Sequence, residues 1–163
     1  MILAVETMVR MGEIAASRSA GDVLVAIGLG SCIGLALVDR TTSVAGLAHV
    51  MLPESNGGES FKFADQAVPA LRGKVVALGA LPSRLEAVLV GGAQMFALKG
   101  GLLDIGARNE AATLELLGRL RIPVVAKATL GSKGRTVRVH VDGCRILCKE
   151  AGGTETHLLG AAA

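Results

Sequence analysis

The side chains of this sequence that could act as nucleophiles or bases are few, namely three cysteines and three histidines. Cys32 directly follows the glycine-rich turn Gly28-Leu29-Gly30-Ser31, where backbone N–H groups can stay free and a side chain can be presented. His49 is the only histidine in the first half of the chain. A thiol beside an imidazole can attack a carbonyl carbon, because an imidazolium lowers the thiol pKa and can later protonate a leaving amine.

A predicted hairpin brings these two residues together. Two apolar runs flank the polar turn DRTTS and predict its strands, Cys32–Val38 and Val44–Leu52. If Val38 pairs with Ser43, Cys32 lies directly opposite His49, and directly opposed Cβ atoms are about 4.5–5.5 Å apart. A slip of one residue would put the two side chains on opposite faces. The alternative is that Cys32 is a small core residue and His49 is satisfied by the backbone.

The other two cysteines are predicted to be core residues. Asp142-Gly143 favours a type I′ hairpin turn that pairs Val137 with Cys148. Cys144 then lies on the same apolar face as Cys148, while His140 lies on the opposite face. Two thiols without a nearby imidazole make a poor zinc site, so we expect no metal.

A dinucleotide-binding site is a second interpretation of the glycine-rich turn. Gly28, Gly30 and Gly34 follow a predicted strand, and Glu54 lies near the position of a ribose-binding acid. The helix that such a site requires would be short and β-branched, and too little chain follows for a doubly wound fold. We therefore expect no cofactor.

Length and composition predict one domain with an aliphatic core. The 163 residues are 51% hydrophobic and include 22 glycines, three phenylalanines and no tyrosine or tryptophan. The lack of aromatic stacking platforms and a net charge of +3 argue against a nucleic-acid partner. The longest uncharged stretch, Val23–Val38, is short and glycine-containing, which argues against insertion in a membrane. Without a signal-peptide pattern we expect a cytoplasmic protein with free thiols.

The pattern of elements predicts an α+β fold, a mixed β-sheet sandwich flanked by helices. One domain is expected over residues 1–163, with a flexible tail over residues 152–163. Besides the strands above, the pattern predicts strands or hairpins at Asp22–Ile27, Arg84–Val90, Val124–Lys127 and Val137–Lys149, and helices at Phe63–Leu78 and Asn109–Leu120. Asn109 is predicted to cap the second helix.

Four motifs, in this order along the chain, resemble those of the CheD family of chemoreceptor glutamine deamidases. They are GLGSC at Gly28–Cys32, AHVMLP at Ala48–Pro53, GGAQMF at Gly91–Phe96 and IGARN at Ile105–Asn109, within a motif-bearing region of about residues 9–153. The resemblance implies a sandwich related to bacterial cysteine deamidase toxins. It also implies hydrolysis of selected glutamines of methyl-accepting chemotaxis receptors to glutamate and ammonia, in chemotactic adaptation.

The resemblance also assigns roles to residues. It places the nucleophile at Cys32 and the general acid and base at His49, with oxyanion donors expected from the turn that holds Gly28, Gly30 and Ser31. It implies two partners, the cytoplasmic domains of the receptors and a CheC-like phosphatase bound through the same face. Three residues of the later motifs are possible neighbours of the site: Gly91, Gly92 and Asn109.

One position departs from the family pattern. The family usually has threonine six residues before the cysteine, where it orients the histidine, whereas this chain has Ala26. Either another acceptor, such as Ser31 or a backbone carbonyl, replaces the threonine, or catalysis is weak. In the second case the chain would act chiefly as a binding module that regulates a CheC-like phosphatase.

Overall fold

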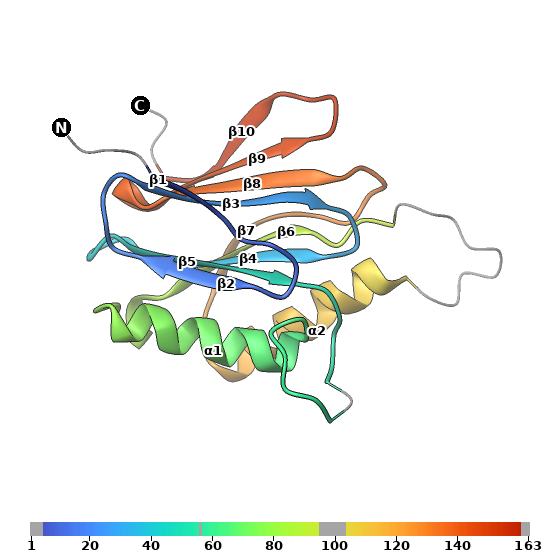
Figure 1. Ribbon diagram of the computed structural model, residues 1–163, viewed down its shortest axis with the longest axis horizontal. Coiled ribbons are helices and arrows are strands. Elements are labelled where there is room, and N and C mark those ends of the chain that lie inside the picture. Colours follow the sequence, from blue (N-terminus) through green and yellow to red (C-terminus); the bar gives the residue numbers. More distant parts are fainter. Residues whose placement is uncertain (1–4, 56, 95–103, 161–163) are drawn as a thin grey trace.

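The described part of the chain is built in three layers, two five-stranded β-sheets and one layer of two helices (Figure 1). The computed structural model describes residues 5–55, 57–94 and 104–160. The first sheet has the order β1–β3–β8–β9–β10 and contains β1 (Val5–Met8), β3 (Asp22–Leu29), β8 (Arg135–His140), β9 (Arg145–Glu150) and β10 (Glu155–Leu159). The second has the order β2–β5–β4–β6–β7 and contains β2 (Ile14–Ser17), β5 (Val44–Val50), β4 (Ile33–Asp39), β6 (Glu86–Gly91) and β7 (Val124–Thr129).

The two helices cover one face of the second sheet (Figure 1). They are α1 (Ala64–Ala77) and α2 (Ile105–Arg119). Two short 3-10 turns lie elsewhere in the chain, η1 (Pro82–Arg84) before β6 and η2 (Asp142–Cys144) between β8 and β9. Both sheets are mixed, because β1 runs parallel to β3 and β6 runs parallel to β7. This confirms the predicted α+β sandwich, with both helices on a single side. Within the described ranges, no helix is long and apolar enough to span a membrane.

The protein has two aliphatic cores, one on each face of the second sheet. Alternate residues of β4 face opposite ways, so Leu35 packs against the helices while Ala36 packs against the first sheet. This two-sided burial explains the continuous apolar runs of β4 and β5, all of whose residues are buried. The high hydropathy therefore belongs to a sheet that is covered on both faces.

The hairpin of β8 and β9 has the predicted register, with Val137 paired to Cys148. Cys144 and Cys148 are buried in the core between the sheets, and His140 lies on the other face. Only the turn type differs from the prediction. Gly143 has a positive φ, whereas Asp142 does not, so the turn is not of type I′.

Two predicted boundaries are wrong. The chain after Gly152 was expected to be a flexible tail, but residues 155–159 form β10, which pairs with β9, and Leu158 and Leu159 pack on the inter-sheet core. Helix α2 begins at Ile105, because the Asp104 side chain accepts a hydrogen bond from the Ala107 N–H and caps it there. Asn109 is therefore inside the helix and is not its cap.

The predicted motif residues Met95 and Phe96 and the tail residues 161–163 lie outside the described residues.

The register of the hairpin between β4 and β5 also differs from the prediction. Val38 pairs with Ala45, and Gly34 lies opposite His49. The reason is Asp39, which looks like a turn residue in the sequence but is the last residue of β4 and is fully buried. The turn therefore spans residues 40–43, and every pairing moves by two positions. Because the shift is even, each side chain keeps its predicted face.

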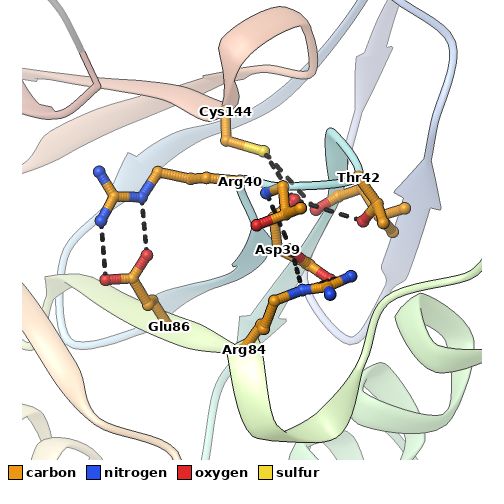
Figure 2. Close-up of polar contacts among 8 residues, drawn as sticks. Asp39, Arg40, Thr42, Arg84, Glu86 and Cys144 are labelled. Carbon is orange, nitrogen blue, oxygen red and sulfur yellow. Dashed lines mark hydrogen bonds and ion pairs between the residues drawn. The ribbon is translucent and has the colours of Figure 1, made fainter.

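Asp39 is held by a polar cluster at the end of β4 (Figure 2). Its carboxylate accepts hydrogen bonds from the Arg84 guanidinium at 3.1 Å, from the Leu81 N–H at 2.9 Å and from the Thr41 N–H at 3.0 Å. Burial by itself would raise the pKa of Asp39, but these hydrogen bonds outweigh it and lower the pKa to about 2. Beside this cluster, Arg40 and Glu86 form a bidentate ion pair that is partly exposed.

Replacing Asp39 with asparagine is expected to destabilise the fold by about 2 kcal/mol at pH 7, because the lowered pKa measures how strongly the folded state favours the carboxylate. A lowered pKa contributes stability above pH 4, and this contribution is lost as the pH falls through about 2. Urea unfolding at pH 7 and at pH 2–3 measures both effects. The control is Glu86→Gln, which removes an exposed pair and should cost less than about 1 kcal/mol. Equal losses in both variants would contradict the assignment.

Candidate active site

The predicted nucleophile lies at the end of the sandwich opposite the Asp39 cluster. Cys32 is half-buried in the short loop between β3 and β4 and packs against the core between the two sheets. The end of β5, the end of β6 and the start of α2 meet at this same end of the molecule (Figure 1). The site is therefore assembled from segments that are far apart in the sequence.

His49 is buried on the inter-sheet face of β5 and is oriented by a backbone group. Its side chain is 3% exposed, and its Nδ1 lies 3.0 Å from the Val9 carbonyl oxygen. Because a carbonyl can only accept, Nδ1 carries the proton and Nε2 has a free lone pair. Among the described residues Nε2 has no hydrogen-bond partner. This is the tautomer that a general base requires, because its basic nitrogen is not engaged by a hydrogen bond.

The segment from Val9 to Glu13 holds both the ring and the backbone of His49. The His49 N–H donates to the Glu13 carbonyl at 3.1 Å, and the His49 carbonyl accepts from the Gly12 N–H at 2.9 Å. Val9 itself is anchored to β3, since its N–H donates to the Val25 carbonyl at 2.7 Å. Sequence reasoning missed this segment, because an orienting backbone carbonyl leaves no signature in the residue types.

Cys32 and His49 lie on the same face but are not directly opposed. His49 is opposite Gly34, so Cys32 is one step further along the same face, two residues before Gly34. Diagonal neighbours of an antiparallel pair are about 7–8 Å apart, within reach of long side chains. The predicted pairing was wrong by two residues, yet the predicted shared face is correct.

The pKa shifts favour a neutral thiol and a neutral imidazole in the free protein. Burial raises the pKa of Cys32, and the smaller effect of its own backbone N–H lowers it. Burial lowers the pKa of His49, against smaller opposing effects of the Val9 carbonyl and Glu13. The sequence-based expectation of an imidazolium that lowers the thiol pKa is therefore not met before substrate binds.

Alkylation of Cys32 by iodoacetamide is expected to accelerate continuously between pH 6 and pH 9, because the raised pKa keeps the thiol protonated at neutral pH. Mass spectrometry of the peptide that contains Cys32 separates its modification from that of Cys144 and Cys148. The control is His49→Asn, in which Cys32 stays equally buried but residue 49 is no longer a histidine. The alkylation rate of Cys32 in this variant should depend on pH in nearly the same way as in the wild type. A rate that is already maximal below pH 7 would instead indicate a thiolate–imidazolium pair.

The loop that carries Cys32 is tied to β6 and α2 through its carbonyl groups. The Gly30 carbonyl accepts from the Ala93 N–H and the Cys32 carbonyl accepts from the Gly92 N–H, both at 2.8 Å. The Ser31 carbonyl accepts from the Asn109 side chain at 2.9 Å. These three bonds all hold the loop from the side of β6 and α2.

Gly91 and Gly92 permit this close approach. A Cβ atom at Gly91 would overlap the Cys32 carbonyl oxygen, and Gly91 also has a φ of +110°, which disfavours other residues. Arg135 holds the end of β6 in place, because its buried guanidinium donates hydrogen bonds to the carbonyls of Gly91 and Leu130. Arg135 has no signature in the sequence other than its inward position on the alternating strand β8.

The direction of the anchored carbonyls determines where two N–H groups point. All the described peptide bonds are trans, and a trans peptide points its C=O and N–H in opposite directions. The N–H groups of Ser31 and Cys32 therefore point away from β6 and α2. Gly28 lies beside the β8–β9 hairpin, where it lines a separate hollow of about 300 Å³.

A half-buried thiol and an imidazole protonated on Nδ1 thus lie on the same face at one end of a two-sheet α+β sandwich, and these are the two residue types that a cysteine-dependent hydrolase uses. The family model described as CheD chemotactic sensory transduction matches residues 51–150. The chain belongs to the CheD family.

Several relatives match over most of the chain. A protein of Caldanaerobacter subterraneus subsp. tengcongensis, named "Probable chemoreceptor glutamine deamidase CheD", is 43% identical over 150 residues, which cover 88% of this chain and 92% of the relative. The "Chemoreceptor glutamine deamidase CheD" of Thermotoga maritima is 38% identical over 150 residues, with 91% and 94% coverage. A relative from Clostridium novyi with the first of these names is 44% identical over 120 residues, with 70% and 74% coverage.

Proposed function

We propose that this protein is a chemoreceptor glutamine deamidase, a hydrolase that converts glutamine side chains of chemotaxis receptors to glutamate. The names of the relatives support the substrate and the reaction. The observation that carries the chemistry is the hydrogen bond from His49 Nδ1–H to the Val9 carbonyl, which leaves Nε2 free as a base on the face that Cys32 shares.

In the first half of the reaction, Cys32 is the nucleophile and His49 carries the proton. The sulfur bonds to the amide carbon while Nε2 takes the thiol proton, and the carbonyl oxygen becomes an oxyanion. The N–H groups of Ser31 and Cys32 stabilise this charge. The C–N bond then breaks, and ammonia leaves with the proton from Nε2.

In the second half, water hydrolyses the thioester. Nε2 takes a proton from water as its oxygen bonds to the acyl carbon, and a second oxyanion forms in the same place. The C–S bond breaks, the proton returns to the sulfur, and glutamate is released. No cofactor or metal enters either half of this scheme.

The alternative function is a weakly catalytic binding module that regulates a CheC-like phosphatase, for which Ala26 was the motive. Ala26 is buried between the sheets and offers no hydroxyl to His49. The Val9 carbonyl supplies the orienting acceptor that the family threonine supplies elsewhere, which favours catalysis. We propose that the protein acts in the cytoplasm and that a CheC-like phosphatase, where the cell has one, is an additional partner.

The test is direct. Purified protein is incubated with the cytoplasmic fragment of a receptor, and conversion of glutamine to glutamate is followed by peptide mass spectrometry. Time-dependent conversion at defined glutamines supports the deamidase, whereas tight binding without conversion supports the binding module.

A further inference from the structure

Asn109 touches both halves of the proposed active site from the middle of a helix. It is fully buried on α2, and its Nδ2 donates to the carbonyls of Ser31 and Met51, each at 2.9 Å. Both partners are carbonyl oxygens, so the NH₂ group of the amide must face them. The bonds join positions that are 78 and 58 residues away from Asn109 in the sequence.

The first of these bonds fixes the peptide that precedes the nucleophile. The Ser31 carbonyl and the Cys32 N–H belong to the same peptide plane and point in opposite directions. Holding the carbonyl toward α2 therefore holds the Cys32 N–H in the direction away from α2. The Cys32 backbone N–H also lowers the pKa of the Cys32 thiol, against the larger effect of burial.

The second bond fixes the end of the strand that carries His49. Met51 follows His49 by two residues, just beyond the end of β5. One amide group thus sets the position of the nucleophile loop relative to the strand of the base. The geometry that results is the one on which proton transfer from the thiol to Nε2 depends.

Helix α2, which carries Asn109, packs closely against the end of β6. The contribution of the Asn109 amide to stability does not by itself explain why an asparagine stands here. A Cβ atom at Gly106 would overlap the Gly92 carbonyl oxygen, so α2 lies directly against the end of β6. The Asn109 Oδ1 is buried and has no partner among the described residues, which costs free energy. The Asn109 side chain is therefore better suited to fixing the positions of the Ser31 and Met51 carbonyls than to stabilising the fold.

Resting on the proposed deamidase function, we propose that Asn109 is a positioning residue that orients the Cys32 N–H as an oxyanion donor and fixes the nucleophile loop relative to the His49 strand.

The test compares Asn109→Asp, which keeps the shape but replaces the donor by an acceptor, with Thr113→Val. Thr113 is a matched control because it is buried one turn along α2 and loses a single hydrogen bond, to the Asn109 carbonyl at 2.8 Å, without contacting the loop. We expect Asn109→Asp to lower kcat for receptor deamidation by about 10²-fold, as for loss of one oxyanion donor, with KM changed less than about threefold. Thr113→Val should keep kcat within about twofold.

A second readout does not depend on deamidation. Because the Cys32 N–H lowers the thiol pKa, misdirecting it should slow alkylation of Cys32 at pH 8 in Asn109→Asp and not in Thr113→Val. Asn109→Ala, which buries no charge, is measured in parallel and gives the same comparison if Asn109→Asp does not fold.

The outcomes separate the two proposals. Equal kcat and equal alkylation rates in the Asn109 and Thr113 variants overturn the positioning role, even when Cys32→Ala is inactive. Undiminished conversion by Cys32→Ala overturns the proposed mechanism, and the alkylation comparison then still decides whether Asn109 orients the Cys32 peptide.

Discussion

Replacing Cys32 with alanine is expected to reduce conversion of receptor glutamine to glutamate by about 10³-fold or more. Alanine removes the protein atom that bonds to the amide carbon in the proposed scheme, so no thioester can form. Because Cys32 is half-buried in a loop and not part of either core cluster proper, the variant should fold normally. Peptide mass spectrometry of the receptor fragment measures the rate.

The matched control is Cys148→Ala. Cys148 is buried in the inter-sheet core on β9 and has no place in the scheme, so this variant should lose stability and keep its rate. Binding of the receptor fragment should be unchanged in Cys32→Ala. If Cys32→Ala and the wild type convert receptor at the same rate, Cys32 is not the nucleophile.

Replacing His49 with asparagine should lower the rate by about 10²- to 10⁴-fold, the usual contribution of a general acid and base. The asparagine Nδ2 occupies the place of the histidine Nδ1 and can keep the hydrogen bond to the Val9 carbonyl. What the substitution removes is Nε2, the atom that receives the thiol proton. The measurement is kcat for receptor deamidation across pH 5–9.

The lowered pKa of His49 also predicts the direction in which the deamidation rate changes with pH. Burial lowers the pKa of His49, so the wild-type rate should rise through a pKa below the ordinary histidine value and then stay level at neutral pH. His49→Asn should lack this rise. The control is His140→Asn, on the face of β8 that points away from the inter-sheet core, which should keep both the rate and its pH dependence. A pH rise that survives in His49→Asn would exclude His49 as the base.

The parts of the fold that could be predicted are those where apolar alternation and turn residues agree. The β8–β9 hairpin is such a case, since Val137 and Val139 alternate with polar residues along β8 and a turn signal, Asp142-Gly143, follows them. The β4–β5 hairpin failed on one residue, because a buried Asp39 held by Arg84 cannot be told from an exposed turn aspartate without its partner. β10 was missed because its pairing with β9 depends on Leu158 and Leu159 packing against a core formed by distant strands.

Some residues of the proposed site could likewise be predicted from the sequence, and others could not. Side-chain chemistry and a glycine-rich turn were enough to single out Cys32 and His49, and the even register error kept them on one face. The groups that orient them were beyond sequence reasoning. The Val9 carbonyl has no residue-type signature, and Asn109 has the appearance of a helix cap until the true cap, Asp104, is seen to lie five positions earlier.

The long sequence separation of the Asn109 hydrogen bonds has a consequence for biosynthesis. Residues 31 and 51 are synthesised well before residue 109. The nascent chain therefore contains the Cys32 thiol and the His49 imidazole before it contains the Asn109 amide that binds their segments. Contacts between such distant residues close large loops and form late in folding. The arrangement of the nucleophile loop and the His49 strand that these hydrogen bonds set is therefore established only after residue 109 has been synthesised.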